Sequence, residues 1–203
     1  MGYEQNVFIN CPFDEQYYPL LRPLLFTVIY LGFTPRLSTE RSNSGEARIE
    51  KLFELIEDSK YGIHDLSRIK AEKVGEYFRL NMPFELGIDI GCGRYGGGRL
   101  DSKQCLILET ERYRFQAAIS DLSNSDIEAH KNEPRQVVVI VRNWLGRVST
   151  AKTVGPTRIW DSFIEFMSVN DEDLTDSGFS ADEIAALPVP ELMDRMETWV
   201  HSL

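Results

Sequence analysis

Two acidic residues stand out as candidates for chemistry in the stretch from residue 61 to residue 91. Asp65 ends a short apolar run, and Glu85 lies in the sequence FELG. A strand that delivers one acid to its carboxyl end, followed by a helix with a second acid in its first turn, builds sites in α/β proteins. A helix N-terminus favours an anion, so Glu85 is predicted to be ionised and to act as a nucleophile or an electrostatic stabiliser. The alternative is that Glu85 only compensates the helix dipole.

The elements that would position these acids alternate between strands and helices. Strands are predicted at residues 6–10, 33–37, 61–64 and 104–108. After the first strand, apolar residues recur every three or four positions from about Tyr17, and Gly32 ends this helix. A second helix is predicted to be capped by Ser44 and to bury Ile49, Leu52, Phe53 and Ile56. The alternation predicts a parallel sheet with right-handed crossovers.

Ligands of open parallel sheets bind outside the carboxyl ends of the strands, and this rule gathers more residues around the two acids. The candidate substrate-binding residues follow the first strand (Asn10, Pro12, Phe13, Asp14), the second (Arg36, Glu40) and the third (Arg68), or lie near Glu85 (Arg79, Asn81, Met82, Phe84). The polar loop at 69–80 is expected to move as such a pocket closes. The alternative is that these residues cap helices and pair with one another on the surface.

The second half of the chain is predicted to be mainly helical. Pro134 and a helical face of four apolar residues favour a helix at 137–148, although the run VVVIV is also compatible with a fifth strand. Residues 113–132 are expected to be helical in part. More helices are predicted at 157–167, from the capping box Ser180-x-x-Glu183, and at 190–200. We expect one domain overall, with an α/β core at 1–110 and a mainly helical extension at 111–203.

The glycine-rich residues 91–99 invite comparison with a phosphate-binding loop. A phosphate loop follows a strand and opens a helix, whereas this segment follows a predicted helix and precedes a predicted strand. It is therefore interpreted as a flexible connector.

The composition argues against several classes of function. A formal net charge of -10 disfavours binding to a nucleic-acid polymer or an anionic membrane. The scattered cysteines and histidines indicate neither a disulfide framework nor a metal site, and His64 is expected to be a hydrogen-bonded core residue. No signal peptide and no apolar run of membrane-spanning length are apparent, so the expected location is a reducing cytoplasm.

Two segments of the chain resemble known families. The sequence NMPFELG at 81–87 resembles the motif of nucleoside 2-deoxyribosyltransferases in which the glutamate is the nucleophile, and VFINCPF at 7–13 resembles their first strand and substrate-binding loop. A strand, a loop and a helix with a glutamate before leucine are also similar to Toll/interleukin-1 receptor (TIR) domains that cleave NAD. The resemblance covers roughly residues 7–108. It implies a flavodoxin-like α/β fold and the cleavage of N-glycosidic bonds.

For this chain, the resemblance implies a ribosyl group with its anomeric carbon near Glu85. Nicotinamide leaves NAD without needing a proton, whereas a purine needs a general acid, for which Asp65 or Asp14 is nearest. Arginines 36, 48, 68 and 79 would suit a diphosphate, which favours NAD as the substrate and requires no separate cofactor. The alternatives are a nucleoside 2-deoxyribosyltransferase or N-glycosidase, and a nucleotide-sensing module without catalysis. The families resembled also imply a homo-oligomer and a role in antiviral defence.

Overall fold

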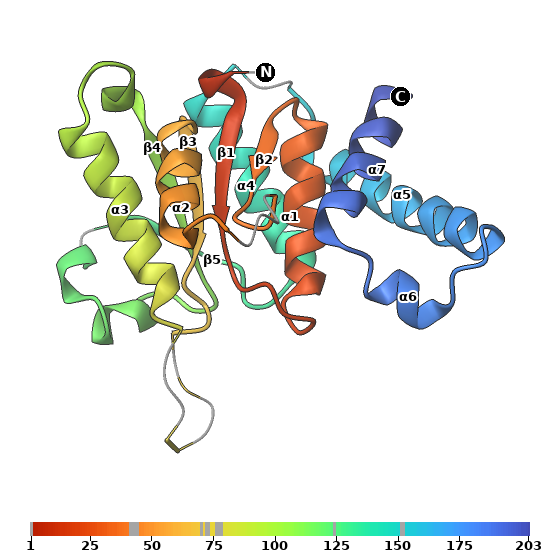
Figure 1. The fold of residues 1–203 in the computed structure, drawn as a ribbon, viewed down its shortest axis with the longest axis horizontal. Coiled ribbons are helices and arrows are strands. Elements are labelled where there is room, and N and C mark those ends of the chain that lie inside the picture. Colours follow the sequence, from red (N-terminus) through yellow and green to blue (C-terminus); the bar gives the residue numbers. More distant parts are fainter. Residues whose placement is uncertain are drawn as a thin grey trace.

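The structure is a computed structural model that describes residues 2–40, 45–69, 71, 74–75, 79–123, 125–150 and 153–203. Its five parallel strands form one sheet in the flavodoxin-like order β2-β1-β3-β4-β5 (Figure 1). The strands are β1 (Asn6–Asn10), β2 (Thr34–Arg36), β3 (Tyr61–Asp65), β4 (Gln104–Glu109) and β5 (Ile127–Ala129). The predicted α/β class and parallel sheet are confirmed, as are the four predicted strands.

The central strands β1 and β3 are buried along their whole length. They pair in parallel, from Val7 beside Tyr61 to Asn10 beside His64. Helices cover both faces of the sheet, so these strands are mainly apolar rather than alternating. Asn6, Asn10, His64 and Asp65 break that rule, and the last three lie at the carboxyl ends of the strands.

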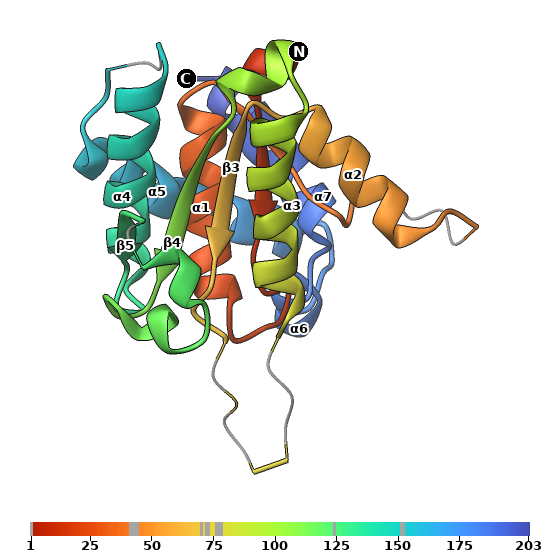
Figure 2. The same cartoon turned by 90° about the vertical axis from the view of Figure 1, so that its left-hand side faces the viewer.

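Two pairs of helices cover the two faces of the sheet. Helices α1 (Tyr18–Tyr30) and α4 (Pro134–Val148) pack together on one face, whereas α2 (Arg48–Glu57) and α3 (Asn81–Tyr95) lie on the other (Figure 2). The helix predicted after the first strand is confirmed, and Gly32 follows it with a φ of 87°. The helical interpretation of residues 137–148 is also confirmed.

The remaining helices are α5 (Pro156–Asp176), α6 (Ala181–Ala185) and α7 (Val189–His201) (Figure 1). α5 packs against α1 and α4, α7 packs against α1 and α5, and α6 packs against α5. The ring of Phe26 in α1 meets those of Phe163, Phe166 and Trp199 at centroid distances of 5.5, 5.7 and 5.8 Å. The predicted capping box at Ser180 and Glu183 is present. Within the described ranges, no helix is long and apolar enough to cross a membrane.

Three details of the predicted organisation differ from the structure. β5 and α4 complete the sheet and its cover from beyond residue 110, so the predicted boundary does not coincide with the edge of the core. β5 was not predicted, because its three residues are too few for a periodic signal. The first half of the glycine-rich segment is not a connector but the end of α3, and a 3-10 helix (Gly98–Ser102) follows it.

The buried face of α2 also differs from the predicted one. Leu52 and Ile56 are buried as expected, together with Leu55, whereas Ile49 and Phe53 are 37% and 43% exposed. The helix meets Phe8 and α3 through a narrow apolar stripe, so the outer part of the predicted face stays in contact with solvent. The predicted cap, Ser44, lies outside the described residues.

Candidate active site

The topological switch point of the sheet lies between β1 and β3. After β1 the chain crosses one face in α1 to reach β2, and after β3 it crosses the opposite face in α3 to reach β4 (Figure 2). In open α/β sheets, ligands bind outside the carboxyl ends of the strands at such a point. Asn10 and Asp65 end the two strands here.

Glu85 is the fifth residue of α3 and therefore lies in its second turn, not in the first turn as predicted. Its side chain is buried, and within the described parts of the chain its carboxylate accepts no hydrogen bond and forms no ion pair. Burial raises the pKa of Glu85 to about 7, against the opposing charge of Arg48. The prediction of a carboxylate kept ionised by the helix terminus is therefore wrong: desolvation prevails, and Glu85 is about half protonated at neutral pH.

Three of the predicted acids lie around Cys11, the residue that follows β1. The Cys11 thiol is buried, and its pKa is raised well above the ordinary value by burial and then by the carboxylates of Asp65, Glu85 and Asp14. These acids are far apart in the sequence, yet all three raise the pKa of this one thiol. The thiol itself stays protonated, which makes it a poor nucleophile.

Asn10 connects the end of β1 to the start of α3. Its Nδ2 donates to the carbonyl of Met82 over 2.8 Å and lies 3.0 Å from Nδ1 of His64. Because Nδ2 is a donor, Nδ1 of His64 is the acceptor, and the ring proton is on Nε2. Met82 is in the first turn of α3, so Asn10 fixes the helix turn that precedes Glu85. His64 is confirmed as a hydrogen-bonded core residue.

A buried ion-pair network continues from His64 along α3. His64 Nε2 donates to Asp89 Oδ2 over 2.8 Å, and Lys103 Nζ lies 2.9 Å from Asp89 Oδ1. Burial would raise the pKa of Asp89, but His64 and Lys103 outweigh it and lower the pKa. Lys103 also donates to the carbonyl of Ile56 over 2.7 Å. Asp89 is therefore an ionised residue in the core.

Gly62 makes this network possible. A Cβ at this position of β3 would lie 2.1 Å from Asp89 Oδ2 and 2.8 Å from His64 Nε2. The sequence analysis missed Asp89 and Lys103. A signal was present, because Glu85 and Asp89 are spaced by four residues in an apolar helix, which places both acids on the same, buried face.

Asp65 is buried in a second network, on the other side of the switch point. Burial would raise its pKa, but contacts with His130, Ser67 and Tyr17 lower it. His130 Nε2 lies 3.2 Å from Asp65 Oδ2, the Ser67 amide donates to Oδ1 over 2.7 Å, and the Tyr17 hydroxyl donates to Oδ2. His130 lies just after β5, and no role was predicted for it from the sequence. Asp65 thus connects the loop after β3 with Tyr17, which precedes α1, and with His130, which follows β5.

Arg68, predicted to bind substrate, lines a cavity of about 640 Å³ at the same edge of the sheet, together with Gln16, Tyr17, Ser67, Arg114 and Asn132. Arg114, which the sequence analysis missed, is paired with the buried Glu109 through Nε and Oε2 at 3.0 Å. Glu85 is not among the residues that line this cavity. The structure therefore places Arg68 and Glu85 beside different parts of the switch point.

The other predicted binding residues divide into paired, buried and exposed groups. Arg79 Nη2 lies 2.8 Å from Asp14 Oδ2, and Arg36 Nε lies 3.0 Å from Glu40 Oε2. Pro12 is buried, Phe13 is half-buried against the core, and Asn81 and Phe84 are exposed. Only the first pair joins two parts of the predicted site, because Arg36 and Glu40 are four residues apart. Half of the predicted mobile loop at 69–80 lies outside the described residues.

The fold and the switch-point residues define the class to which the chain belongs: a flavodoxin-like α/β protein with a buried glutamate beside the carboxyl ends of its central strands. Among the described residues this glutamate has no hydrogen-bond or ion-pair partner. No protein-family model, curated protein or solved structure matches the chain. In the described ranges, no group of three or more histidine, cysteine, aspartate or glutamate side chains is arranged to hold a metal ion.

Proposed function

We propose that this protein hydrolyses the N-glycosidic bond between nicotinamide and ribose in NAD, with Glu85 as the catalytic carboxylate. The observation that carries this proposal is the state of Glu85 beside the switch point: it is buried, has no partner in the described part of the chain, and has a pKa of about 7. Unpaired buried carboxylates are costly to keep, and perturbed pKa values cluster at functional sites.

The role of Glu85 in breaking the glycosidic bond follows from its lack of partners among the described residues. As the glycosidic bond breaks, positive charge develops on the ribose ring, and a carboxylate with few competing hydrogen bonds stabilises that charge strongly. The bond electrons go to the nicotinamide ring, which leaves as a neutral base. Water then adds to the anomeric carbon and releases a proton, so the products are nicotinamide, ADP-ribose and one proton.

The states of the neighbouring acids favour NAD over a purine nucleoside. A neutral purine needs a proton from a general acid while a second group stabilises the sugar. Asp65 has a lowered pKa, two hydrogen bonds and a close contact with His130, and Asp14 is paired with Arg79. The lowered pKa leaves Asp65 without a proton to donate at neutral pH. Nicotinamide needs none, so Glu85 alone suffices.

The same surroundings offer positive charge for a diphosphate. Arg48 acts on the charge of Glu85 from the start of α2, and Arg79 precedes α3 with a side chain that is 52% exposed. Exposed guanidinium groups can bind phosphate oxygens in a bidentate manner. These arginines support a dinucleotide as the substrate.

The proposal is tested by incubating the full chain, at high concentration to allow assembly, with NAD and with a panel of nucleosides, and by following the free base by chromatography. We expect nicotinamide from NAD. Glu85→Gln, which keeps the shape of the side chain, should reduce release by about a thousandfold. Glu57→Gln, at an exposed position of α2, is the matched control and should retain full activity. Release of no base from any substrate, or full activity of Glu85→Gln, would refute the proposal.

A further inference from the structure

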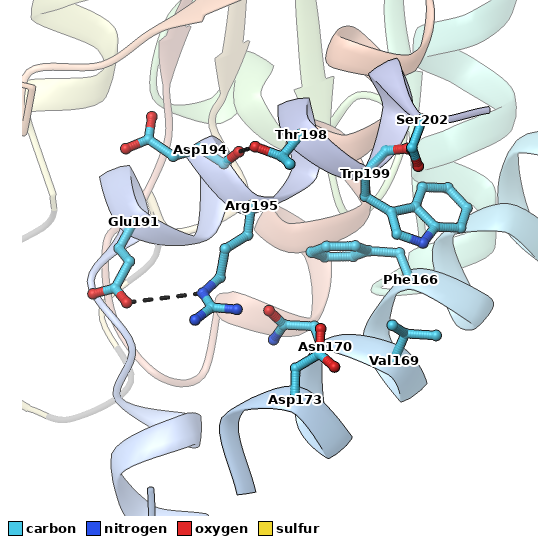
Figure 3. Close-up of a pocket in the computed structure, with 10 residues that line it drawn as sticks. All are labelled: Phe166, Val169, Asn170, Asp173, Glu191, Asp194, Arg195, Thr198, Trp199 and Ser202. Atoms are coloured by element: carbon cyan, nitrogen blue, oxygen red, sulfur yellow. Dashed lines mark hydrogen bonds and ion pairs between the residues drawn. The ribbon is translucent and has the colours of Figure 1, made fainter. Parts of the chain in front are cut away.

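A cavity of about 420 Å³ lies between α5 and α7, outside the layers that build the switch point (Figure 3). One side is apolar and includes Phe166, Val169 and Trp199, with the two aromatic rings in edge contact at a centroid distance of 5.9 Å. The opposite side is charged, and there Arg195 Nε lies 3.8 Å from Glu191 Oε1. A molecule that fits both sides has a flat apolar surface and a polar edge.

Asn170 supplies a hydrogen-bonding group that has no partner among the residues that the structure describes. Its side chain is 4% exposed, and its Oδ1 is buried without a hydrogen bond from any described residue. Figure 3 shows the carboxamide pointing from α5 toward Arg195. Buried polar groups are nearly always paired in folded proteins, because an unpaired one destabilises the fold. A carboxamide is satisfied best by a partner that presents a donor beside an acceptor.

The charges around the cavity decide which partners are suitable. Three carboxylates (Asp173, Glu191, Asp194) and one guanidinium group (Arg195) line it, which leaves a formal charge of -2. This charge repels phosphates and other anions. The polar edge of the ligand is therefore not anionic, and the carboxamide of Asn170, itself uncharged, pairs best with an uncharged edge that carries both a donor and an acceptor.

We propose that this cavity binds an uncharged planar heterocycle with adjacent hydrogen-bond donor and acceptor groups, such as a free nucleobase or nicotinamide. The ring packs against Trp199 and Val169, and its polar edge pairs with the Asn170 carboxamide. The proposal does not depend on catalysis at Glu85.

The first test is titration of the full chain with adenine, nicotinamide, adenosine and AMP, followed by saturation-transfer NMR of the ligand and by tryptophan fluorescence. Adenine, nicotinamide or both should give a saturable signal, and the separate titrations show which of the two ligands binds. AMP should bind at least about tenfold more weakly than adenosine because of its charge. The absence of a saturable signal from both adenine and nicotinamide, or equal binding of AMP and adenosine, would overturn the proposal.

The second test separates this cavity from the proposed active site. Asn170→Leu should weaken binding of the heterocycle by about tenfold or more. It should also leave the melting temperature unchanged or raise it, because an unpaired polar group is removed. Asn143→Leu, at an exposed position of α4, is the control and should bind as the native protein does. Unchanged binding in Asn170→Leu would show that the ligand sits elsewhere, and a lower melting temperature would show that Asn170 has a structural partner; either result contradicts the proposal.

Discussion

Two acids on the same face of α3 have opposite electrostatic states. Glu85 and Asp89 are both buried and are four residues apart, yet the pKa of Glu85 is raised to about 7 and that of Asp89 is lowered. The difference lies in their partners, because Asp89 contacts His64 and Lys103 whereas Glu85 has no hydrogen bond or ion pair with the described residues. Burial alone therefore does not set the charge of an acid. In this protein the presence or absence of partners distinguishes the structural acid, Asp89, from the candidate catalytic acid, Glu85.

The largest expected effect comes from Asp89→Asn. The variant keeps the shape of the side chain but leaves Lys103, whose side chain is 4% exposed, without its counter-charge. We expect a loss of about 3 to 5 kcal/mol in the free energy of unfolding, measured by urea denaturation. Asp101→Asn, on the exposed 3-10 helix, is the control and should change stability little. A loss similar to that of the control would show that the network does not hold an ionised acid.

Gly62→Ala, a substitution in β3, tests the network of Asp89, His64 and Lys103 from the side of the sheet. The new methyl group would overlap Asp89 Oδ2 and displace it from His64. We expect a loss of about 2 to 4 kcal/mol in the free energy of unfolding. In the matched variant Gly146→Ala, at an exposed position of α4, the helix should instead become more stable by about 0.5 to 1 kcal/mol. Equal effects of the two substitutions would mean that Gly62 is not needed for close packing.

Glu85→Gln should change the free energy of unfolding in the opposite direction to Asp89→Asn, and the size of this change should depend on pH. The folded-state pKa of about 7 exceeds the ordinary value of 4.5, so the folded protein holds this proton more tightly than the unfolded chain. Native stability should therefore fall by up to about 3 kcal/mol as the pH rises from about 4.5 to about 7. Glu85→Gln should lack this fall. Parallel stability curves for the two proteins from pH 4 to pH 8 would argue that Glu85 has an ordinary pKa.

The smallest expected effect concerns Asp65, the partnered acid on the other side of the switch point. Its pKa is lowered, so its contribution to stability is present above its ordinary pKa of 3.8 and is lost as the pH falls through the folded-state value. Tyr17→Phe removes one donor to Asp65 and should cost about 1 to 2 kcal/mol at neutral pH. Acid unfolding should also begin at a higher pH in this variant. Unchanged acid unfolding would show that the Tyr17 hydroxyl does not stabilise the carboxylate.

The sequence predicted the sheet well because its strands are continuous apolar runs and its helices have clear periodicity and caps. It also placed Glu85 and Asp65 near the switch point, since the carboxyl ends of parallel strands share one edge. The sequence did not predict whether the two carboxyl groups are protonated or ionised in the folded protein. Those depend on His130, Lys103 and Gly62, which become neighbours of the acids only in the folded chain.

The positions of the arginines were also beyond prediction. Arg36 and Arg79 are paired with acids, and Arg68 lies beside a different cavity from the one expected at Glu85. Side-chain direction at the end of a strand depends on loop conformation, which local patterns do not specify. β5 escaped prediction for a different reason, because three residues carry too little pattern.

The most direct test of the central claim is the pH dependence of nicotinamide release from NAD at a concentration below KM. This rate reports the pKa of the free enzyme. Because only the ionised carboxylate stabilises the ribosyl cation, we expect the rate to rise with pH through a midpoint near 7, the folded-state pKa of Glu85. Glu85→Gln should release nicotinamide much more slowly, and its rate should not rise with pH near 7. A rate in the native protein that does not change between about pH 5 and about pH 9, or an equal rate in Glu85→Gln, would contradict the account.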